Sequence, residues 1–361
     1  MPSTIITTAT KRMRDLFVIF LSMLSACSFL KKEEPVSREL ETERKVIRQL
    51  EEKFGFINVD EKVHDYSYYL DSAGFVEYIR IIDKNLEELP QEIFQLKRLT
   101  SIGLFSENIT DIPKDLDKIE SLEKINLLKM PIRRVSNLKL PDKLKFINFT
   151  ECPLEEFPKL YKENDSIPYD LIISDTKIDT IPDFVGEMNL SELDAEHCPL
   201  TYVSPNLGDC ENITQLNFEG IKNLKLPDEL RKLKKVEDLN LKWTALRKIP
   251  DFVWEMKNLD ALYITSNLIT EIPPEIGKLK KLKFLYAQGN YIATLPKEFA
   301  QIKGIELIHL EGNPIKTRSL PAELFFPRTT KEKPELLVNV PGRYDCFSVP
   351  EEQVRQAFDV D

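Results

Sequence analysis

The sequence predicts an α/β solenoid, in which short parallel strands line the concave side of a curved array and short helical turns form its convex side. Two observations carry this prediction. A 23-residue pattern recurs along most of the chain, and within each copy the spacing of the apolar residues changes from two to three or four. With 361 residues, of which 42% are hydrophobic, the chain can also bury a sizeable core.

The repeating unit is LxxLxLxxNxLxxLPxxIxxLxx. When the segments that begin at Leu99, Leu259 and Leu282 are written above one another, every apolar position coincides. Eleven copies follow one another at separations of 22 to 24 residues, and the irregular separations fall in the middle of the array. The first apolar positions of the copies are Val76, Leu99, Leu122, Leu144, Pro168, Leu190, Ile213, Val236, Leu259, Leu282 and Ile305.

Each unit changes its period part of the way along. The segment LxxLxL alternates between inward and outward positions, as a short strand does, whereas the spacing in LPxxIxxL suits a helical or 3-10 turn. Most prolines, such as Pro90 and Pro296, fall where the chain enters this turn. Because one unit cannot bury its own apolar residues, neighbouring units must stack, and coils with a wider turn on one side bend the array into a horseshoe.

This pattern resembles the leucine-rich repeat proteins, specifically the 23-residue arrays with a Leu-Pro step that are common in bacteria. The resemblance covers about residues 76–320. In that family the ninth position carries Asn or Cys, whose side chain bonds the backbone of adjacent coils. The matching residues are Asn267, Asn290, Asn313, Cys152 and Cys198. Six copies depart from the pattern, which predicts less regular coils at Lys84, Glu107, Met130, Thr176, Ile221 and Thr244.

The ends of such an array expose its core, so both ends should be capped. Residues 38–75 are expected to form an N-terminal helical cap, since Leu40, Ile47, Leu50 and Phe54 share one helical face and Gly55 can end the helix. Residues 321–361 leave the repeat phase, and we expect them to close the last coil.

The N-terminus has the parts of a secretory signal peptide over residues 1–26. Basic residues from Lys11 to Arg14 precede an apolar run that starts at Leu16, and small residues follow it. Leu24 to Cys27 resembles the lipobox of bacterial lipoproteins. The resemblance implies that a diacylglycerol alkylates the Cys27 thiol, that the signal is cut before Cys27 and that the new amine is acylated.

A lipidated Cys27 would anchor the chain to a membrane, with residues 27–37 as the anchor and a short tether. The next residue, Ser28, lacks the Asp that retains lipoproteins at the inner membrane in the best-known bacterial sorting pathway. The resemblance therefore implies an envelope protein of the outer membrane, facing the surface or the periplasm.

Composition and motifs exclude several classes of function. Charged residues make up 30% of the chain, the net charge is -10, and no basic block is long enough to follow a phosphate backbone, so nucleic acid is not expected as a partner. The sequence contains no HExxH, GxSxG, GxxxxGK or paired CxxC motif. We therefore expect no cofactor, no resident metal and no enzymatic activity.

The concave face can be identified from the period, because positions 2, 3, 5, 7 and 8 of each unit point outward from the core. In the central copies these positions form an acidic stripe of Asp170, Asp175, Glu192, Asp194, Glu196, His197, Glu219, Glu237 and Asp238. Two interpretations stay open: the stripe is a solvated surface, or Asp170, Glu192 and Asp194 hold a divalent cation.

Toward the C-terminus the same positions become aromatic or apolar, and exposed aromatic residues on adjacent strands favour an interface. These residues are Trp243, Tyr263, Phe284, Tyr286, Leu307 and His309. The alternative is that the C-terminal tail covers Phe284 and Leu307.

The sequence thus predicts a non-enzymatic, lipid-anchored protein that binds a protein ligand through the concave face, and the resemblance implies contact with a host. Two alternatives remain: a structural envelope protein without a specific ligand, and an enzyme that uses the acidic stripe. Neither the ligand nor the oligomeric state is predicted. The expected binding residues are Asp170, Glu192, Asp194, Glu196, His197, Asp238, Trp243, Tyr263, Phe284 and Tyr286.

Overall fold

The computed structural model describes residues 38–58, 66–316, 320 and 337–339. The chain divides into two compact units, Met1–Lys45 and Val46–Asp361. Of the first unit, only the helical residues 38–45 are described. The expected signal peptide, the lipobox with Cys27, the tether and most of the expected C-terminal cap therefore lie outside the described residues. No helix within the described ranges is long and apolar enough to cross a membrane.

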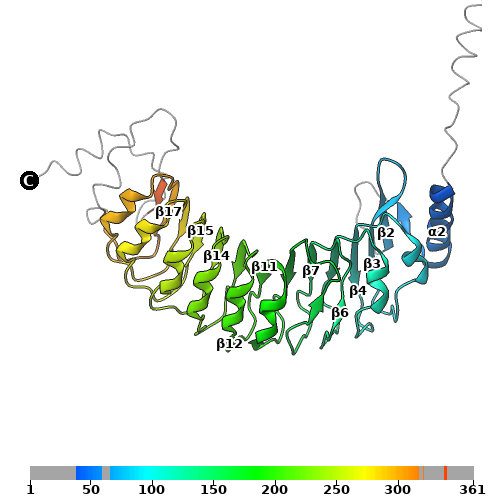
Figure 1. The fold of residues 1–361 in the computed structure, drawn as a ribbon, viewed down its shortest axis with the longest axis horizontal. Helices are drawn as coiled ribbons and strands as arrows, with labels where there is room; N and C mark the ends of the chain where they lie inside the picture. The colour runs from blue at the N-terminus through cyan, green and yellow to red at the C-terminus, as the bar shows by residue number, and fades with distance from the viewer. Residues whose placement is uncertain (1–37, 59–65, 317–319, 321–336, 340–361) are drawn as a thin grey trace, which may run out of the picture. The chain divides into compact units, whose positions relative to one another are not determined.

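Among the described residues of the second unit, 14 strands form one sheet, and neighbouring strands there are parallel except for β2 with β3, which are antiparallel (Figure 1). Each predicted repeat contributes one strand. These strands are β3 (Val76–Ile82), β4 (Ser101–Phe105), β5 (Lys124–Leu127), β7 (Phe146–Asn148), β9 (Tyr169–Ile172), β11 (Leu190–Asp194), β13 (Gln215–Asn217), β14 (Asp238–Asn240), β15 (Ala261–Tyr263), β16 (Phe284–Tyr286) and β17 (Leu307–His309). The predicted α/β solenoid is confirmed.

The convex side consists mainly of 3-10 helices of five residues each. They are η1 (Gln91–Gln95), η2 (Lys114–Lys118), η3 (Asp183–Glu187), η4 (Pro205–Asp209), η5 (Asp228–Lys232), η6 (Asp251–Glu255), η7 (Pro274–Lys278) and η8 (Lys297–Gln301). A proline stands at the N-cap of each one except η4, where Ser204 caps the helix and Pro205 follows. Proline suits this place because its fixed φ starts the turn and its missing N–H is not needed there.

The central coils are irregular, as their separations predict. The copies that begin at Leu122 and Leu144 have no 3-10 helix; their convex sides carry the short parallel strands β6 (Leu138–Lys139) and β8 (Leu160–Tyr161), which pair with each other. A second such pair joins β10 (Thr180–Ile181) to β12 (Tyr202–Val203) in the next two coils.

The inward residues of successive coils form one continuous core, in which Leu262, Leu285 and Ile308 are fully buried. One repeat origin was wrong. Tyr169, and not Pro168, pairs with Leu190 and is buried, because β11 contains a bulge between Leu190 and Glu192. The bulge shifts the register by one residue at the start of that coil.

Asparagines at the ninth position connect the coils as expected. The Asn290 amide nitrogen donates to the Ile264 carbonyl of the preceding coil at 2.8 Å and to the Ala287 carbonyl of its own coil at 3.1 Å. Its side-chain oxygen accepts the Ile269 N–H at 3.1 Å. Asn267 and Asn313 make the same kind of contacts, so polar backbone groups inside each turn are satisfied without water.

Other side chains replace asparagine in several coils. Cys152 and Cys198 donate from sulfur to the carbonyls of Leu127 and Ile173 in the preceding coils. Thr244 donates to the Leu241 carbonyl at 2.8 Å, so its coil is more regular than its sequence predicts.

The first two copies depart from the pattern, as their sequences predict. Lys84 and Glu107 at the ninth position point outward and form an ion pair at 3.0 Å. One residue before Glu107, the buried hydroxyl of Ser106 donates to the Leu86 carbonyl at 2.6 Å and satisfies this turn instead.

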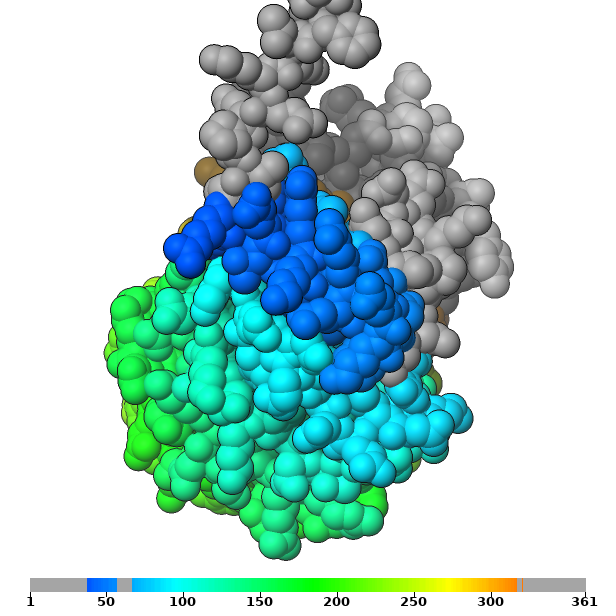
Figure 2. All heavy atoms as spheres, turned by 90° about the vertical axis from the view of Figure 1, so that its right-hand side faces the viewer, coloured from blue at the N-terminus to red at the C-terminus, as the bar shows by residue number. Residues whose placement is uncertain are grey.

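Helix α2 (Arg38–Phe54) precedes the first coil in the chain, and strands β1 (Ile57–Asn58) and β2 (Tyr66–Leu70) extend the sheet beyond β3. Within the second unit, Val46, Ile47 and Leu50 on the helix and Phe56 after it join the core. Figure 2 faces the N-terminal end of the second unit, with its first coils in cyan. At the other end, β18 (Leu337–Asn339) pairs in parallel with β17 and extends the sheet by one strand.

The asparagine contacts predict a large difference between buried and exposed amides. Asn290→Ala should lower the free energy of unfolding by about 1 to 3 kcal/mol, because it leaves the buried Ile269 N–H without its acceptor. The Ile264 and Ala287 carbonyls each lose one of two side-chain donors and keep Asn267 and Asn313, respectively. The exposed Asn206 also bonds a carbonyl of the preceding coil, at 3.1 Å from Asp183. Asn206→Ala should cost about 0.5 kcal/mol or less in the same chemical denaturation experiment, since water can replace that bond. If both variants lost the same free energy of unfolding, the ninth-position asparagines would not have this stabilising role.

Candidate ligand-binding face

Strand pairing arranges the outward side chains of the concave face in straight rows. The third position gives one row, which runs from Asp170 through Glu192, Gln215, Asp238, Ala261 and Phe284 to Leu307. The fifth position gives a second row, which runs from Ile172 through Asp194, Asn217, Asn240, Tyr263 and Tyr286 to His309. Both rows become apolar or aromatic at β15, so the predicted acidic and aromatic halves exist in the folded chain.

The acidic half brings Asp170, Glu192 and Asp194 together on β9 and β11. Asp170 accepts a hydrogen bond from the Ser191 hydroxyl at 2.7 Å. Asp194 accepts the Ser174 hydroxyl at 2.7 Å and the Glu196 N–H at 3.0 Å. These bonds fix the orientation of both carboxylates, and the bond to the Glu196 N–H also fixes the backbone where the strand ends.

Glu192 lies between these charges. Burial, followed by the negative charges of Asp170, Asp194 and Asp238, raises the pKa of its carboxyl from the usual 4.5 to about 7. Burial also raises the pKa of Asp238, and Asp260 and Glu237 add to this effect. The acidic half therefore changes its charge near neutral pH.

Glu196 and His197 lie at the end of β11. Burial raises the pKa of Glu196, as do the charges of Glu219 and Asp194. The His197 Nδ1 atom lies 3.3 Å from an Asp175 oxygen and 3.6 Å from a Glu196 oxygen. Its ring fills the space beside Gly220, where a Cβ would come within 2.2 Å of the ring, so any other residue at that position of the next coil would require the ring to move.

In the aromatic half the rings are stacked. The Tyr263 and Tyr286 rings are parallel within 2° at a centroid distance of 4.7 Å, and the His309 ring meets Tyr286 edge-on at 5.4 Å. Tyr263, Phe284 and Tyr286 lie at the predicted outward positions and are half-buried. The rings form a rigid platform with one face toward solvent.

Trp243 is different, because its side chain is 60% exposed and its φ is +59°. In the next three coils the equivalent eighth position also has a positive φ but carries Ser266, Gly289 and Gly312. A bulky residue in the left-handed region costs about 1 to 2 kcal/mol, and an exposed ring does not offset this by burial. Such an outlier points to a function for the side chain.

Sequence reasoning included the seventh-position residues Glu196 and Glu219 but left out Lys242, which connects the two halves. Lys242 forms an ion pair with Glu219 at 2.8 Å and lies 5.4 Å from the centre of the Tyr263 ring. Burial favours a higher pKa for Glu219, but hydrogen bonds from Lys242 and Asn240 outweigh it and lower the pKa. The same period that identified the fifth position would have identified Lys242.

Gln288, another seventh-position residue, contacts the ring of His309. Gln288 accepts the Thr265 hydroxyl at 2.8 Å, and its amide nitrogen lies 2.7 Å from the His309 Nδ1 atom.

Within residues 38–58 and 66–316, no three His, Cys, Asp or Glu side chains are arranged to hold a metal ion. The cation interpretation of Asp170, Glu192 and Asp194 therefore gains no support.

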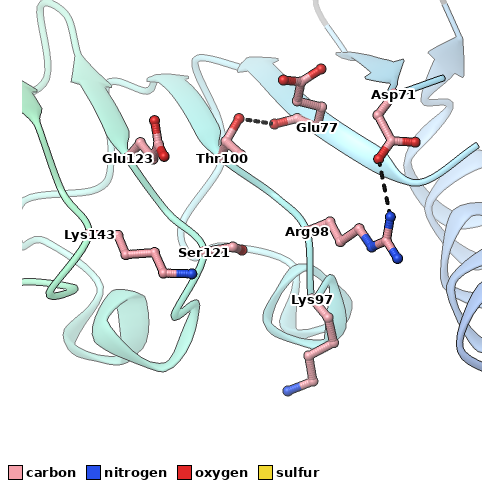
Figure 3. Close-up of a pocket in the computed structure, with 8 residues that line it drawn as sticks. All are labelled: Asp71, Glu77, Lys97, Arg98, Thr100, Ser121, Glu123 and Lys143. Atoms are coloured by element: carbon pink, nitrogen blue, oxygen red, sulfur yellow. Dashed lines mark hydrogen bonds and ion pairs between the residues drawn. The ribbon is translucent and has the colours of Figure 1, made fainter. Parts of the chain in front are cut away.

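A shallow pocket of about 340 Å³ lies elsewhere, beside the first coils (Figure 3). Some of its lining residues bond the protein itself: Arg98 lies 3.6 Å from an Asp71 oxygen and 3.6 Å from the centre of the Phe75 ring, and Thr100 donates to the Glu77 carbonyl at 3.1 Å. We do not assign a ligand to it.

The raised pKa of Glu192 predicts a dependence of stability on pH. The folded state holds this proton up to about pH 7, whereas the unfolded chain loses it near pH 4.5, so stability should fall as the pH rises between these values. Glu192→Gln should remove this loss and be more stable than the wild type at pH 8, by on the order of 1 kcal/mol, with no gain at pH 4. Thermal unfolding across this range, with Glu275→Gln on the convex side as the control, tests it. An equal gain at both pH values would contradict the assignment.

Comparisons with known proteins agree with this geometry. Residues 257–315 match the family model described as leucine rich repeat. A curated relative, adenylate cyclase from Schizosaccharomyces pombe, is 27% identical over 167 residues. That match covers 39% of this chain but only 10% of the cyclase.

Several solved structures are also similar. The Toll–Spätzle complex of Drosophila has a TM-score of 0.59 at 16% identity and covers 79% of this chain and 38% of the matched chain. An internalin from Listeria monocytogenes has a TM-score of 0.41 at 15% identity, and the match covers 76% of this chain and 91% of the internalin chain. A leucine-rich repeat protein from Leptospira interrogans has a TM-score of 0.30 at 22% identity, and the match covers 64% of this chain and 83% of the Leptospira chain.

The assignment of the fold follows from the repeat geometry, from the family match and from the likeness to the Toll chain. The chain contains a leucine-rich repeat domain that folds as an α/β solenoid with a concave parallel sheet.

Proposed function

We propose that this chain is a non-enzymatic recognition protein that binds another protein through the concave face and is held at a membrane by lipidated Cys27. The observation that carries the binding proposal is the aromatic platform of Tyr263, Tyr286 and His309 with the exposed, strained Trp243 at its border. Tyrosine and tryptophan supply much contact area with little loss of side-chain entropy.

The chemistry of the ligand follows from the two halves. A partner that fits both would place apolar or aromatic side chains on the platform and basic side chains over Glu192, Asp194 and Glu196. The acidic half would attract such a partner over a distance and raise its association rate, whereas the platform would hold the partner once bound. The Toll–Spätzle structure is likewise a complex of two proteins.

The carboxylates of Asp170 and Asp194 already accept hydrogen bonds from serine hydroxyls, and Asp194 also accepts one from a backbone N–H. This favours a binding role over a catalytic one. The match to adenylate cyclase covers 10% of that enzyme, and we transfer no activity from it.

The location rests on the N-terminal sequence. Basic residues, an apolar run and Leu24 to Cys27 occur in the order of a lipoprotein signal, and a lipid at Cys27 with the tether 27–37 would hold the solenoid at the surface of the outer membrane. From there the concave face can contact a protein outside the cell, such as one of a host.

The membrane proposal predicts that metabolic labelling with a fatty acid marks the wild type but not Cys27→Ala. The variant should also keep its signal peptide, because cleavage follows lipidation. Cys346→Ala is the matched control and should be labelled as strongly as the wild type. Equal labelling of Cys27→Ala and the wild type would refute lipidation at this residue.

The binding proposal is tested first by capture. A photocrosslinking amino acid at position 265, on the platform side of the concave face, should capture a specific protein on intact cells, and the same group at position 275 on the convex side should not. Dissociation constants for the captured protein then separate the roles of the residues.

Trp243→Gly should weaken binding by about 30-fold, which corresponds to about 2 kcal/mol, through faster dissociation. Its free energy of unfolding should stay the same or rise by up to about 1 kcal/mol, because glycine adopts a positive φ without strain. Glu196→Gln with Glu237→Gln should slow association several-fold and reduce its dependence on salt. If all three substitutions leave both rates unchanged, the concave face is not the binding surface.

A further inference from the structure

The folded chain gathers lysines that the sequence keeps apart. They are the last residue of a 3-10 helix or lie in the segment that leads from it to the next strand, in the four successive coils that contain η5 to η8, and all are exposed. We call this surface the basic edge; it consists of Lys232, Lys234, Lys235, Lys257, Lys278, Lys280, Lys281 and Lys303. The equivalent segments of the central coils carry Asp165, Glu187 and Glu211 instead, so these coils separate the edge from Lys97, Lys118 and Lys143 in the first coils.

Few carboxylates neutralise these lysines. On the same segments Glu255 lies 3.7 Å from both Lys257 and Lys278, and Lys232 pairs with Asp209 at 2.8 Å. The acidic residues at or just before the starts of the following strands are Glu237, Asp238, Asp260 and Glu306, of which Asp260 is paired with Lys283 at 2.6 Å. Among the described ion pairs, none includes Lys234, Lys235, Lys280, Lys281 or Lys303.

Neutral oxygens hold several of these ammonium groups at equivalent places. Lys235 donates to the Asn212 side-chain oxygen at 2.6 Å, and Lys281 donates to that of Asn258 at 2.7 Å. Lys234 and Lys280 donate to the carbonyls at the ends of η6 and η8, each at 3.4 Å. The positive charges are therefore ordered by the fold but not cancelled, and they recur with the spacing of the coils, about 5 Å at the level of the strands.

The chemistry of the edge points to one class of partner. Lysines act as point charges without the planar fork of arginine, so they suit a partner with many repeated charges more than a single bidentate anion. The large exposed apolar side chains of the described chain are Leu70, Leu128, Tyr161, Tyr202, Trp243 and Tyr291, and none lies on the edge. The edge thus offers no aromatic ring for a nucleic acid base and no apolar group to enter a bilayer.

We propose that the basic edge binds a linear sulfated polysaccharide, whose charges recur along the chain at about the length of one sugar unit, comparable with the spacing of the coils. Binding at this edge is independent of the concave face, because the lysines lie in the turns before the strands and the aromatic platform lies on the strands themselves. One solenoid could therefore hold a protein and a polyanion together.

The test uses a size-defined heparin oligosaccharide as the probe and the chain from residue 28 onward. Lys280→Gln, Lys281→Gln and Lys303→Gln together should weaken binding at physiological ionic strength by about tenfold or more and should flatten its dependence on salt, because fewer counterions are exchanged. The matched control removes three exposed lysines outside the edge, Lys222→Gln, Lys225→Gln and Lys248→Gln, and should change affinity by less than about twofold. Both triple variants should melt at the wild-type temperature.

Three results would overturn the proposal. Equal losses in the two triple variants would show that only net charge matters, and no binding by the wild type would remove the site. Binding to vesicles that contain phosphatidylglycerol, with none to heparin, would make the edge a membrane surface instead. Trp243→Gly should bind heparin as the wild type does, so failure of this proposal can be told apart from failure of the concave-face proposal.

Discussion

The hydrogen bonds between successive coils are the constraint on which the rest of the structure depends. No coil buries its own apolar residues or pairs its own strand, so each is stable only through its neighbours. Asn267, Asn290 and Asn313 add side-chain bonds inside the turn, where carbonyls would otherwise be buried without partners. Cysteine and threonine do the same in other coils with fewer bonds, which explains how the array tolerates departures from its pattern.

Fixed stacking has an electrostatic consequence for the surface. Residues at one position of successive repeats become neighbours, whatever their charge, so repeats with acidic outward positions produce crowded carboxylates around Glu192. The fold reduces this repulsion in two ways: serine hydroxyls bond Asp170 and Asp194, and the Glu192 carboxyl keeps its proton to a higher pH. Farther along, the same stacking brings Tyr263 and Tyr286 into parallel contact.

The eighth position of each repeat shows how backbone strain and function are connected. The turn after the strand needs a positive φ there in every coil from Lys129 to Gly312, and glycine meets this need without strain. His197 and Trp243 occupy it with large side chains, and the neighbouring Gly220 makes room for the histidine ring. His197 borders the acidic half of the candidate face and Trp243 borders the aromatic half, so both strained residues lie where they can contact a ligand.

The sequence by itself determined the period, and the period determined the fold, because a spacing of two followed by three or four allows only a strand and a turn in each unit. It also determined the outward rows, including Glu192, Asp194, Tyr263 and Tyr286. Only the tertiary structure decided the bulge at β11, which makes Tyr169 and not Pro168 the inward residue, since the pairing of neighbours sets the register there. It also decided the burial of the rings and the gathering of lysines along one edge. Residues one repeat apart are distant in the chain but adjacent in space, so interspersed charges in the sequence become separate surfaces in the fold.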